Sequence, residues 1–241
     1  MLIFEYTEAE EFYLKDTLLD LFERVLSVKY TTIPKTEASY YYEMRGDILY
    51  IFFEHSNGIV DWRNNFDFPS KHYTEKDEKW YVHRGFLRVW KSAREQLKEQ
   101  ICNKRVRGIV IVGYSHGAAL ALLCHEFCVN NRPDIANEIF GYGFGCPRVV
   151  HGRLKRSICE RFKKFYIIRN CRDIVPHLPP VIFGFHHVGN ILHIGKKAKY
   201  GHVESHKSEN YIRELKIMNS LPTKDRPKIQ VILCDNQCGS N

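Results

Sequence analysis

The sequence predicts an α/β fold, with a mostly parallel central sheet, helices on both faces and antiparallel strands at one edge. From residue 108 onwards, short apolar runs alternate with segments of helical periodicity, which is typical of parallel strands joined by helices. Two earlier strand-like runs are separated only by Arg45-Gly46, a turn signal that favours an antiparallel pair. With 241 residues and 44% hydrophobic residues, the chain is expected to form one domain over residues 1–241 with a substantial core.

The first half of the chain contains two helical patterns and two strands. Residues 8–27 place apolar side chains at helical spacing, and so do residues 85–101, where Phe86, Val89, Trp90, Ala93, Leu97 and Ile101 recur. Residues 38–44 and 47–55 read as the two early strands. Residues 57–82 are polar and irregular, with scattered aromatic residues, so a long loop is expected there.

The second half of the chain contains the alternating strands and helices. Strands are expected at 108–113, 138–144, 165–170, 190–194 and 228–233. Helices are expected at 116–130, 151–162 and 207–218. Helices that connect successive parallel strands must cover the sheet, which accounts for the layered architecture.

The charge balance is basic, with 36 Lys and Arg against 28 Asp and Glu, a net charge of +8. Much of it lies in residues 153–172 and 196–207. We interpret it mainly as a solvated basic face and keep peripheral contact with an anionic lipid surface as the alternative. No recognised nucleic-acid motif accompanies the charge, so no nucleic-acid partner is expected.

Cysteine usage and the termini bear on location. Cys124 and Cys128 lie in an apolar run, where a free thiol packs as a small hydrophobe, and Cys234 and Cys238 are interpreted as packing or surface residues. The acidic start MLIFEYTEAEEF does not resemble a secretory signal, and no apolar run approaches the roughly 20 residues that span a bilayer. Reduced thiols and a cytoplasmic location are therefore expected.

The central chemical feature is Gly113-Tyr114-Ser115-His116-Gly117. It directly follows an apolar β-rich run and directly opens a helix, the context of a nucleophile elbow. A sharp strand-to-helix turn needs nearly side-chain-free residues two before and two after the serine. The helix N-terminus adds partial positive charge where an oxyanion would form. The competing interpretation is a glycine-rich turn with an incidental serine.

A serine nucleophile needs an imidazole base that is itself oriented by a carboxylate. Downstream of Ser115, Asp173 follows a predicted strand, whereas Asp134 belongs to a turn that ends a helix. Several histidines are candidates for the base: His177, His186, His187, His193, His202 and His206. A metal site built from His186, His187, His193 and His202 lacks a helical pair with a carboxylate, so these are interpreted as core, loop or surface residues. No metal or cofactor is expected.

Several segments together resemble the class 3 lipases, the fungal-lipase-like branch of the α/β hydrolases. They are VHRGFLRVW (82–90), GYSHG (113–117), FGCPRV (144–149), RNCRDIVPHLPP (169–180), HHVG (186–189) and the spacing from His206 to Tyr211. The similarity runs from about Asp47 to Tyr211. It implies an α/β-hydrolase fold with Ser115 as nucleophile, Asp173 as orienting acid and His206 as base.

The resemblance also implies an oxyanion hole and a short lid. The donors would be at Ser56 and at the backbone N–H of His116, although Glu54-His55 departs from the Arg-Gly that the family carries before this position. The lid would occupy residues 57–67, where Ile59, Val60, Trp62 and Phe66 would meet lipid. Because the rest of this segment is polar, only a modest activation at lipid interfaces is expected.

The implied function is hydrolysis of carboxylic esters of lipids through an acyl-enzyme, with a lipid or small ester as the substrate. Two alternatives remain open at this point. The same triad could serve a thioesterase or an acyltransferase. The altered Glu54-His55 segment could instead mark a catalytically impaired lipase-fold protein that acts as a basic binding module for lipid or another partner.

Overall fold

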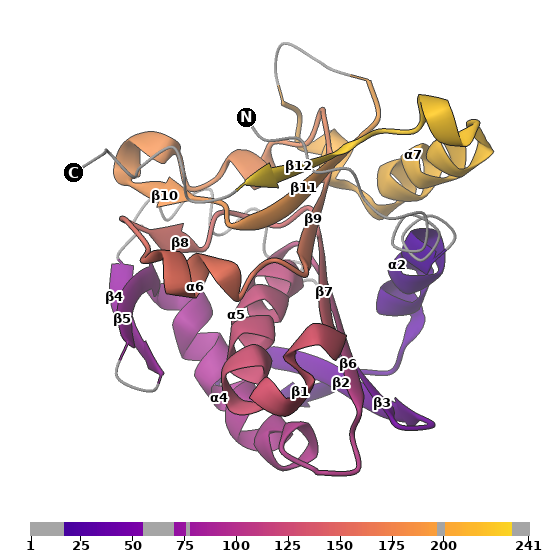
Figure 1. Ribbon diagram of the computed structural model, residues 1–241. Helices are drawn as coiled ribbons and strands as arrows, with labels where there is room; N and C mark the ends of the chain where they lie inside the picture. Colours follow the sequence, from indigo (N-terminus) through magenta and orange to yellow (C-terminus); the bar gives the residue numbers. More distant parts are fainter. Residues whose placement is uncertain (1–16, 55–69, 76–77, 197–200, 233–241) are drawn as a thin grey trace.

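The computed structural model describes residues 17–54, 70–75, 78–196 and 201–232. Their strands form two sheets, one of eight strands in the order β1-β2-β3-β6-β7-β9-β11-β12 and one of four strands in the order β10-β8-β5-β4 (Figure 1). The larger sheet is the layer onto which the helices pack.

The larger sheet has a parallel centre and antiparallel edges. Its strands are β1 (Thr31–Ile33), β2 (Ala38–Arg45), β3 (Ile48–Phe53), β6 (Gly108–Tyr114), β7 (Ile139–Phe144), β9 (Phe165–Asn170), β11 (Gly189–Ile194) and β12 (Ile229–Ile232). Strands β3, β6, β7, β9 and β11 run parallel to one another. Antiparallel strands β1 and β2 lie at one edge and β12 at the other. The predicted parallel sheet with an antiparallel edge is confirmed.

The smaller sheet corrects the prediction of a loop over residues 57–82 from Ser70 onwards, whereas residues 57–69 lie outside the described residues. It contains β4 (Ser70–Glu75), β5 (Glu78–His83), β8 (Val150–His151) and β10 (Phe185–His186), all antiparallel. In the hairpin β4–β5, Tyr73, Trp80 and Val82 are buried, whereas Lys79 and Tyr81 are exposed. The alternating apolar pattern that predicts a strand is weak in so short a run. In addition, the pairing of β5 with β8 joins distant parts of the chain, which local sequence does not reveal.

Helices cover both faces of the larger sheet. They are α2 (Thr17–Ser27), α4 (Arg84–Ile101), α5 (His116–Asn131), α6 (Arg156–Glu160) and α7 (Ser208–Ser220). Helices α4 and α5 lie on one face, and α2 and α7 lie on the other (Figure 1). The expected helix over 151–162 is too long, because His151 is held in β8 by its pairing with β5 and β10. Residues 8–16 of the first expected helix lie outside the described residues.

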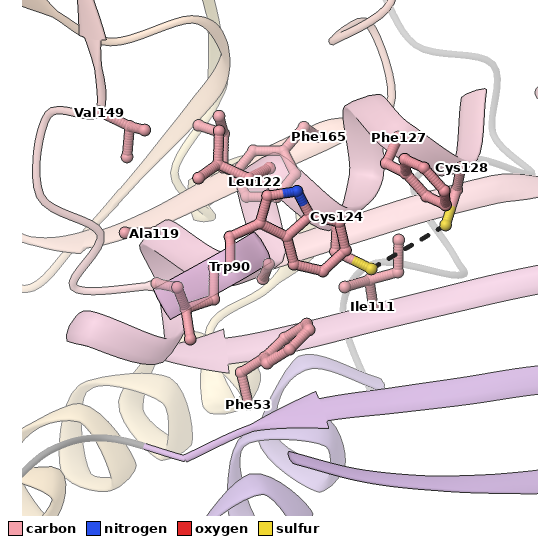
Figure 2. Packing of buried hydrophobic residues seen from close by; sticks show 14 of the residues in the cluster. Phe53, Trp90, Ile111, Ala119, Leu122, Cys124, Phe127, Cys128, Val149 and Phe165 are labelled. Atoms are coloured by element: carbon pink, nitrogen blue, oxygen red, sulfur yellow. Dashed lines mark hydrogen bonds between the residues drawn. The ribbon is translucent and has the colours of Figure 1, made fainter. Parts of the chain in front are cut away.

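The core on the α4 and α5 side is built around Trp90. Its ring makes edge contacts with Phe53 of β3 and Phe127 of α5, at centroid distances of 6.1 and 5.8 Å (Figure 2). Helix α5 is buried on all sides from Gly117 to Cys128, which makes it the central helix of the layer. Its small residues Ala118 and Ala119 allow a close approach to the sheet.

The cysteines differ in oxidation state. The Cys124 and Cys128 thiols are buried and free, with sulfur atoms 3.9 Å apart (Figure 2). Cys102, Cys146 and Cys171 also carry reduced thiols. Cys159, in contrast, is disulfide-bonded. The expectation of reduced thiols is therefore wrong at this position.

We expect the buried imidazole of His125 to make the fold sensitive to acid. Its Nε2 lies 3.1 Å from the Arg161 carbonyl, its ring packs on Phe165, and loss of hydration lowers its pKa to about 4. The unfolded chain takes up this proton below about pH 6.5, so the contribution is full above that pH and is lost as pH falls through about 4. From about pH 7 to about pH 4, this residue alone should remove about 3 kcal/mol from the free energy of unfolding.

The matched variant is His125→Gln, which keeps a donor for the Arg161 carbonyl and does not titrate. Denaturant unfolding across this pH range should give a shallower loss of stability for the variant than for the wild type. Parallel pH dependences in the two proteins would contradict the assignment of a neutral buried imidazole.

Candidate active site

Ser115 lies at a strained turn between β6 and α5. Its φ of +57° and ψ of −121° place a non-glycine residue in a region that side chains disfavour. A Cβ on Gly113 would lie 2.2 Å from the Gly117 carbonyl oxygen, and a Cβ on Gly117 would lie 2.3 Å from the Phe53 carbonyl oxygen. Neither position tolerates a side chain, so the predicted nucleophile elbow is confirmed in its geometry.

Three side chains from distant parts of the sequence form a hydrogen-bonded chain. The Ser115 Oγ lies 2.7 Å from His206 Nε2, and His206 Nδ1 lies 2.6 Å from Asp173 Oδ2. Ser115 follows β6, Asp173 follows β9, and His206 follows β11, so all three stand at the carboxyl ends of parallel strands. All three are buried, and each is 1% exposed or less. This arrangement allows the imidazole to take the serine proton while the carboxylate stabilises the resulting imidazolium.

Asp173 is fixed by donors on both carboxylate oxygens. Its Oδ1 accepts the Val175 N–H at 2.8 Å, and its Oδ2 accepts the Tyr211 hydroxyl at 2.6 Å in addition to His206. Fixed donors hold the carboxylate in the plane and position that the imidazole requires. Burial and the nearby Asp173 carboxylate raise the pKa of Tyr211, so its hydroxyl stays protonated and remains a donor.

His206 is held through its backbone as well as its ring. It ends the short 3₁₀ helix Glu204–His206 just before α7, and the Tyr114 hydroxyl donates to its carbonyl. The Tyr114 ring stacks on the imidazole at a centroid distance of 5.2 Å. The Asn170 side-chain amide donates to the Ser205 carbonyl at 3.1 Å, which ties the loop of the acid to the turn of the base.

These supporting roles were missed by sequence reasoning. Tyr114 occupies the variable position of the elbow, and Asn170 lies in the loop of Asp173, and neither position by itself indicates a supporting role. The spacing from His206 to Tyr211 is part of the family resemblance, but it does not by itself reveal a bond to the acid. The spacing of Tyr211 was the one signal available, since each contact joins residues at least 35 positions apart in sequence.

His116 is placed where an oxyanion donor would be. As the first residue of α5, its backbone N–H has no acceptor within the helix and adjoins the nucleophile. Its partly buried ring packs 5.4 Å from Phe86, and loss of hydration lowers its pKa to about 4. The ring is therefore neutral at pH 7 and adds no charge to the site.

The remaining predicted residues are apart from the triad or outside the described part of the chain. Ser56, Ile59, Val60, Trp62 and Phe66 lie outside the described residues, so the second oxyanion donor and the lid stay predictions. Asp134, the alternative acid, instead forms a salt bridge of 2.9 Å with buried Arg132.

The other histidines occupy core, partly buried and surface positions. His187 is buried with its Nε2 2.7 Å from the Pro176 carbonyl, and burial lowers its pKa to about 3. His186 and His193 are partly buried, and His202 is exposed. Within the described residues, no three His, Cys, Asp or Glu side chains gather as a metal-ligand set.

Removing the Tyr211 hydroxyl tests its positioning role. We expect Tyr211→Phe to lower kcat for a soluble ester about tenfold with little change in KM, because the lost bond orients Asp173 and does not touch substrate. Tyr142→Phe is the matched control, since Tyr142 is a buried tyrosine of β7 whose ring stacks on Tyr166 rather than on a triad residue. An equal loss in both variants, or a loss confined to KM, would argue for a purely structural role.

Comparison with known proteins agrees with this geometry. The sequence matches the family described as lipase (class 3) over residues 50–183, more than half of the chain. The chain belongs to the class 3 lipase family. A lipase from Rhizomucor miehei is 30% identical over 153 residues, which cover 60% of this chain and 42% of that protein. A secreted mono- and diacylglycerol lipase from Fusarium solani is 25% identical, over 55% of this chain and 39% of its own. The chain thus spans about two-fifths of the length of these relatives.

Solved lipase structures share the fold. The triacylglyceride lipase of Rhizomucor miehei superposes with a TM-score of 0.64 at 23% identity, covering 79% of this chain and 82% of that one. The lipase of Rhizopus microsporus var. chinensis gives 0.62 at 20% identity, with coverages of 87% and 85%. A triacylglycerol lipase described as having a serine protease triad at its catalytic centre gives 0.62 at 22% identity, with coverages of 79% and 82%. This class 3 lipase domain therefore has the α/β-hydrolase fold.

Proposed function

We propose that this class 3 lipase family member is a serine hydrolase that cleaves carboxylic esters of lipids through an acyl-enzyme. The observation that carries the proposal is the continuous chain from Ser115 Oγ to His206 Nε2 at 2.7 Å and from His206 Nδ1 to Asp173 Oδ2 at 2.6 Å. The strained backbone of Ser115 and the bracing of Asp173 by Tyr211 support it, because both hold the reacting atoms in place before substrate arrives.

The reaction follows from these positions. As the Ser115 Oγ attacks the ester carbonyl, its proton passes to His206 Nε2, and the carbonyl oxygen becomes an oxyanion beside the His116 N–H. The imidazolium then gives the proton to the leaving alcohol, and the acyl group remains on Ser115. Water attacks this acyl-enzyme, gives a proton to His206, and releases the carboxylic acid as Ser115 regains the proton.

The names of the relatives support a lipid substrate. They include the lipase of Rhizomucor miehei, the mono- and diacylglycerol lipase of Fusarium solani and a phospholipase A1 of Oryza sativa that is 29% identical over 122 residues. Ser115 is only 1% exposed, so an ester must displace neighbouring side chains before it reaches the Oγ. A cytoplasmic location stays a prediction. The Fusarium relative is called secreted, and the disulfide at Cys159 is typical of an oxidising compartment.

Covalent labelling tests the proposal directly. A fluorophosphonate probe, which captures activated serines, should modify wild-type protein at Ser115, and the label should be absent from folded Ser115→Ala. A series of p-nitrophenyl esters of increasing chain length then reports hydrolysis, and a thioester of matched acyl length separates the thioesterase alternative. Folded wild type that neither takes the label nor turns over any ester would favour a binding module on a lipase fold.

A further inference from the structure

We propose that two adjacent surface segments dock this protein on an anionic lipid surface. The first, the apolar tip, is the short 3₁₀ helix formed by Val181, Ile182 and Phe183. The second, the basic segment, consists of Arg153, Lys155 and Arg156. The proposal rests on the proposed function in one respect only: docking would bring the active site to esters held in lipid.

The apolar tip presents three consecutive large apolar side chains to solvent. Val181, Ile182 and Phe183 are 59%, 87% and 51% exposed. Isolated exposed apolar residues are ordinary on protein surfaces, whereas a contiguous apolar patch marks an interaction site. Tyr81 of β5, in the sheet that the chain enters after the tip, is 43% exposed and has an aromatic side chain of the kind enriched at membrane interfaces.

The pairing of β8 with β10 places the basic segment beside the tip. His151 of β8 lies opposite Phe185 of β10, and the Gly152 N–H donates to the Gly184 carbonyl at 3.0 Å. The chain that leaves β8 towards Arg153 therefore runs alongside the chain that enters β10 from Phe183. Figure 1 shows β8 and β10 together at one side of the molecule, with α6 beside them.

The charge of the basic segment is not balanced by nearby acidic residues in sequence. Arg153, Lys155 and Arg156 are exposed. The sequence has no Asp or Glu between residues 145 and 159, and none between 174 and 203. Glu160 lies 3.8 Å from Arg156, but the Arg156 side chain is 91% exposed, so this contact is strongly screened by water.

This combination fits an anionic lipid surface. Apolar side chains insert below the headgroups, and cations beside them attract phosphate and carboxylate groups. A single signal of either kind gives weak and reversible binding, whereas two adjacent signals reinforce each other. A neutral lipid surface would bind the apolar tip but would not attract the cations of the basic segment.

The position of the tip relative to the catalytic groups makes docking useful. The loop that begins at Asp173 continues through Val175 to the tip. The Arg148 guanidinium donates to the carbonyls of His177 and Pro179, the latter at 2.8 Å, which fixes the middle of this loop. The tip is therefore joined to Asp173 by a short segment that Arg148 holds in place.

Vesicle co-sedimentation with the Ser115→Ala protein tests the proposal without any turnover of lipid. Vesicles of phosphatidylcholine alone are compared with vesicles that also contain phosphatidylserine. We expect stronger binding to the anionic vesicles, and we expect it to weaken as salt rises from about 0.1 M to about 1 M and the Debye length falls from about 10 Å to about 3 Å. In this background, Ile182→Ser should lower the partition coefficient about tenfold on both vesicle types.

The charge variant is Arg153→Ala with Lys155→Ala, for which we expect a loss of about tenfold on anionic vesicles and little change on neutral ones. Ile217→Ser, at a 48% exposed position of α7, is the apolar control. Lys104→Ala with Arg105→Ala is the charge control, because these exposed cations directly precede β6, in a different segment of the chain. Thermal melting verifies that each variant is folded.

Two outcomes would overturn the proposal: no binding of Ser115→Ala to anionic vesicles, or equal losses in the tip variants and their controls. Because binding is measured without catalysis, this failure is separable from that of the proposed function. Wild type that hydrolyses soluble esters but ignores vesicles would retain the enzyme and reject the docking surface. Vesicle binding by a protein that takes no fluorophosphonate label would retain the docking surface and reject the enzyme.

Discussion

Replacing His206 by alanine is expected to lower kcat for a soluble ester by about 10⁶-fold, comparable with loss of the serine itself in other triads. The reason is that His206 Nε2 is 2.7 Å from the Ser115 Oγ, so the imidazole both removes the proton and later returns it to the leaving group. Turnover of one p-nitrophenyl ester at saturating concentration is the measurement.

His202→Ala is the matched control for this experiment. The two histidines are four residues apart, and the His202 N–H donates to the Arg172 carbonyl at 2.6 Å, so His202 also belongs to the surroundings of the acid. Its side chain, however, is exposed, whereas that of His206 is buried against the serine. His202→Ala should keep most of the turnover. Retention by His206→Ala together with loss in His202→Ala would transfer the role of base to His202.

Asp173→Asn is expected to lower kcat by up to about 10⁴-fold while the protein stays folded. An asparagine at this position can still accept the Val175 N–H, which bonds to Asp173 Oδ1 at 2.8 Å. An amide nitrogen directed at His206 Nδ1 would instead favour the wrong imidazole tautomer and would not stabilise the imidazolium. Circular dichroism and ester turnover measured on the same preparation separate folding from catalysis.

Asp134→Asn provides the comparison for Asp173→Asn. The Asp134 carboxylate lies 2.9 Å from the Arg132 guanidinium, and that hydrogen bond lowers its pKa. Removing its charge weakens a partly exposed ion pair, whose contribution to stability is small. We expect nearly full turnover from this variant. A severe loss of kcat in Asp134→Asn with full activity in Asp173→Asn would show that the acid is misassigned.

Local patterns predicted the parts of the fold that depend on neighbouring residues. The helical spacing from Phe86 to Ile101 matches α4, and the run FYIIRN matches β9. The hairpin β4–β5 is hard to predict locally because exposed lysines such as Lys71 and Lys79 weaken its apolar pattern, and its second strand pairs with β8, about 70 residues away. Short strands depend on such distant partners more than on their own propensity.

The sequence by itself determined the sharp turn that presents Ser115, since an apolar strand, two glycines around Ser115 and a following helix specify such a turn locally. The order of motifs also pointed to Asp173 and favoured His206. Only the tertiary structure decided that His206, not His202, meets Ser115, and that Tyr211, Tyr114 and Asn170 brace the acid and the base. The physical reason is that side-chain orientation at the strand ends is set by contacts between residues far apart in sequence, whereas a turn is set by its own backbone.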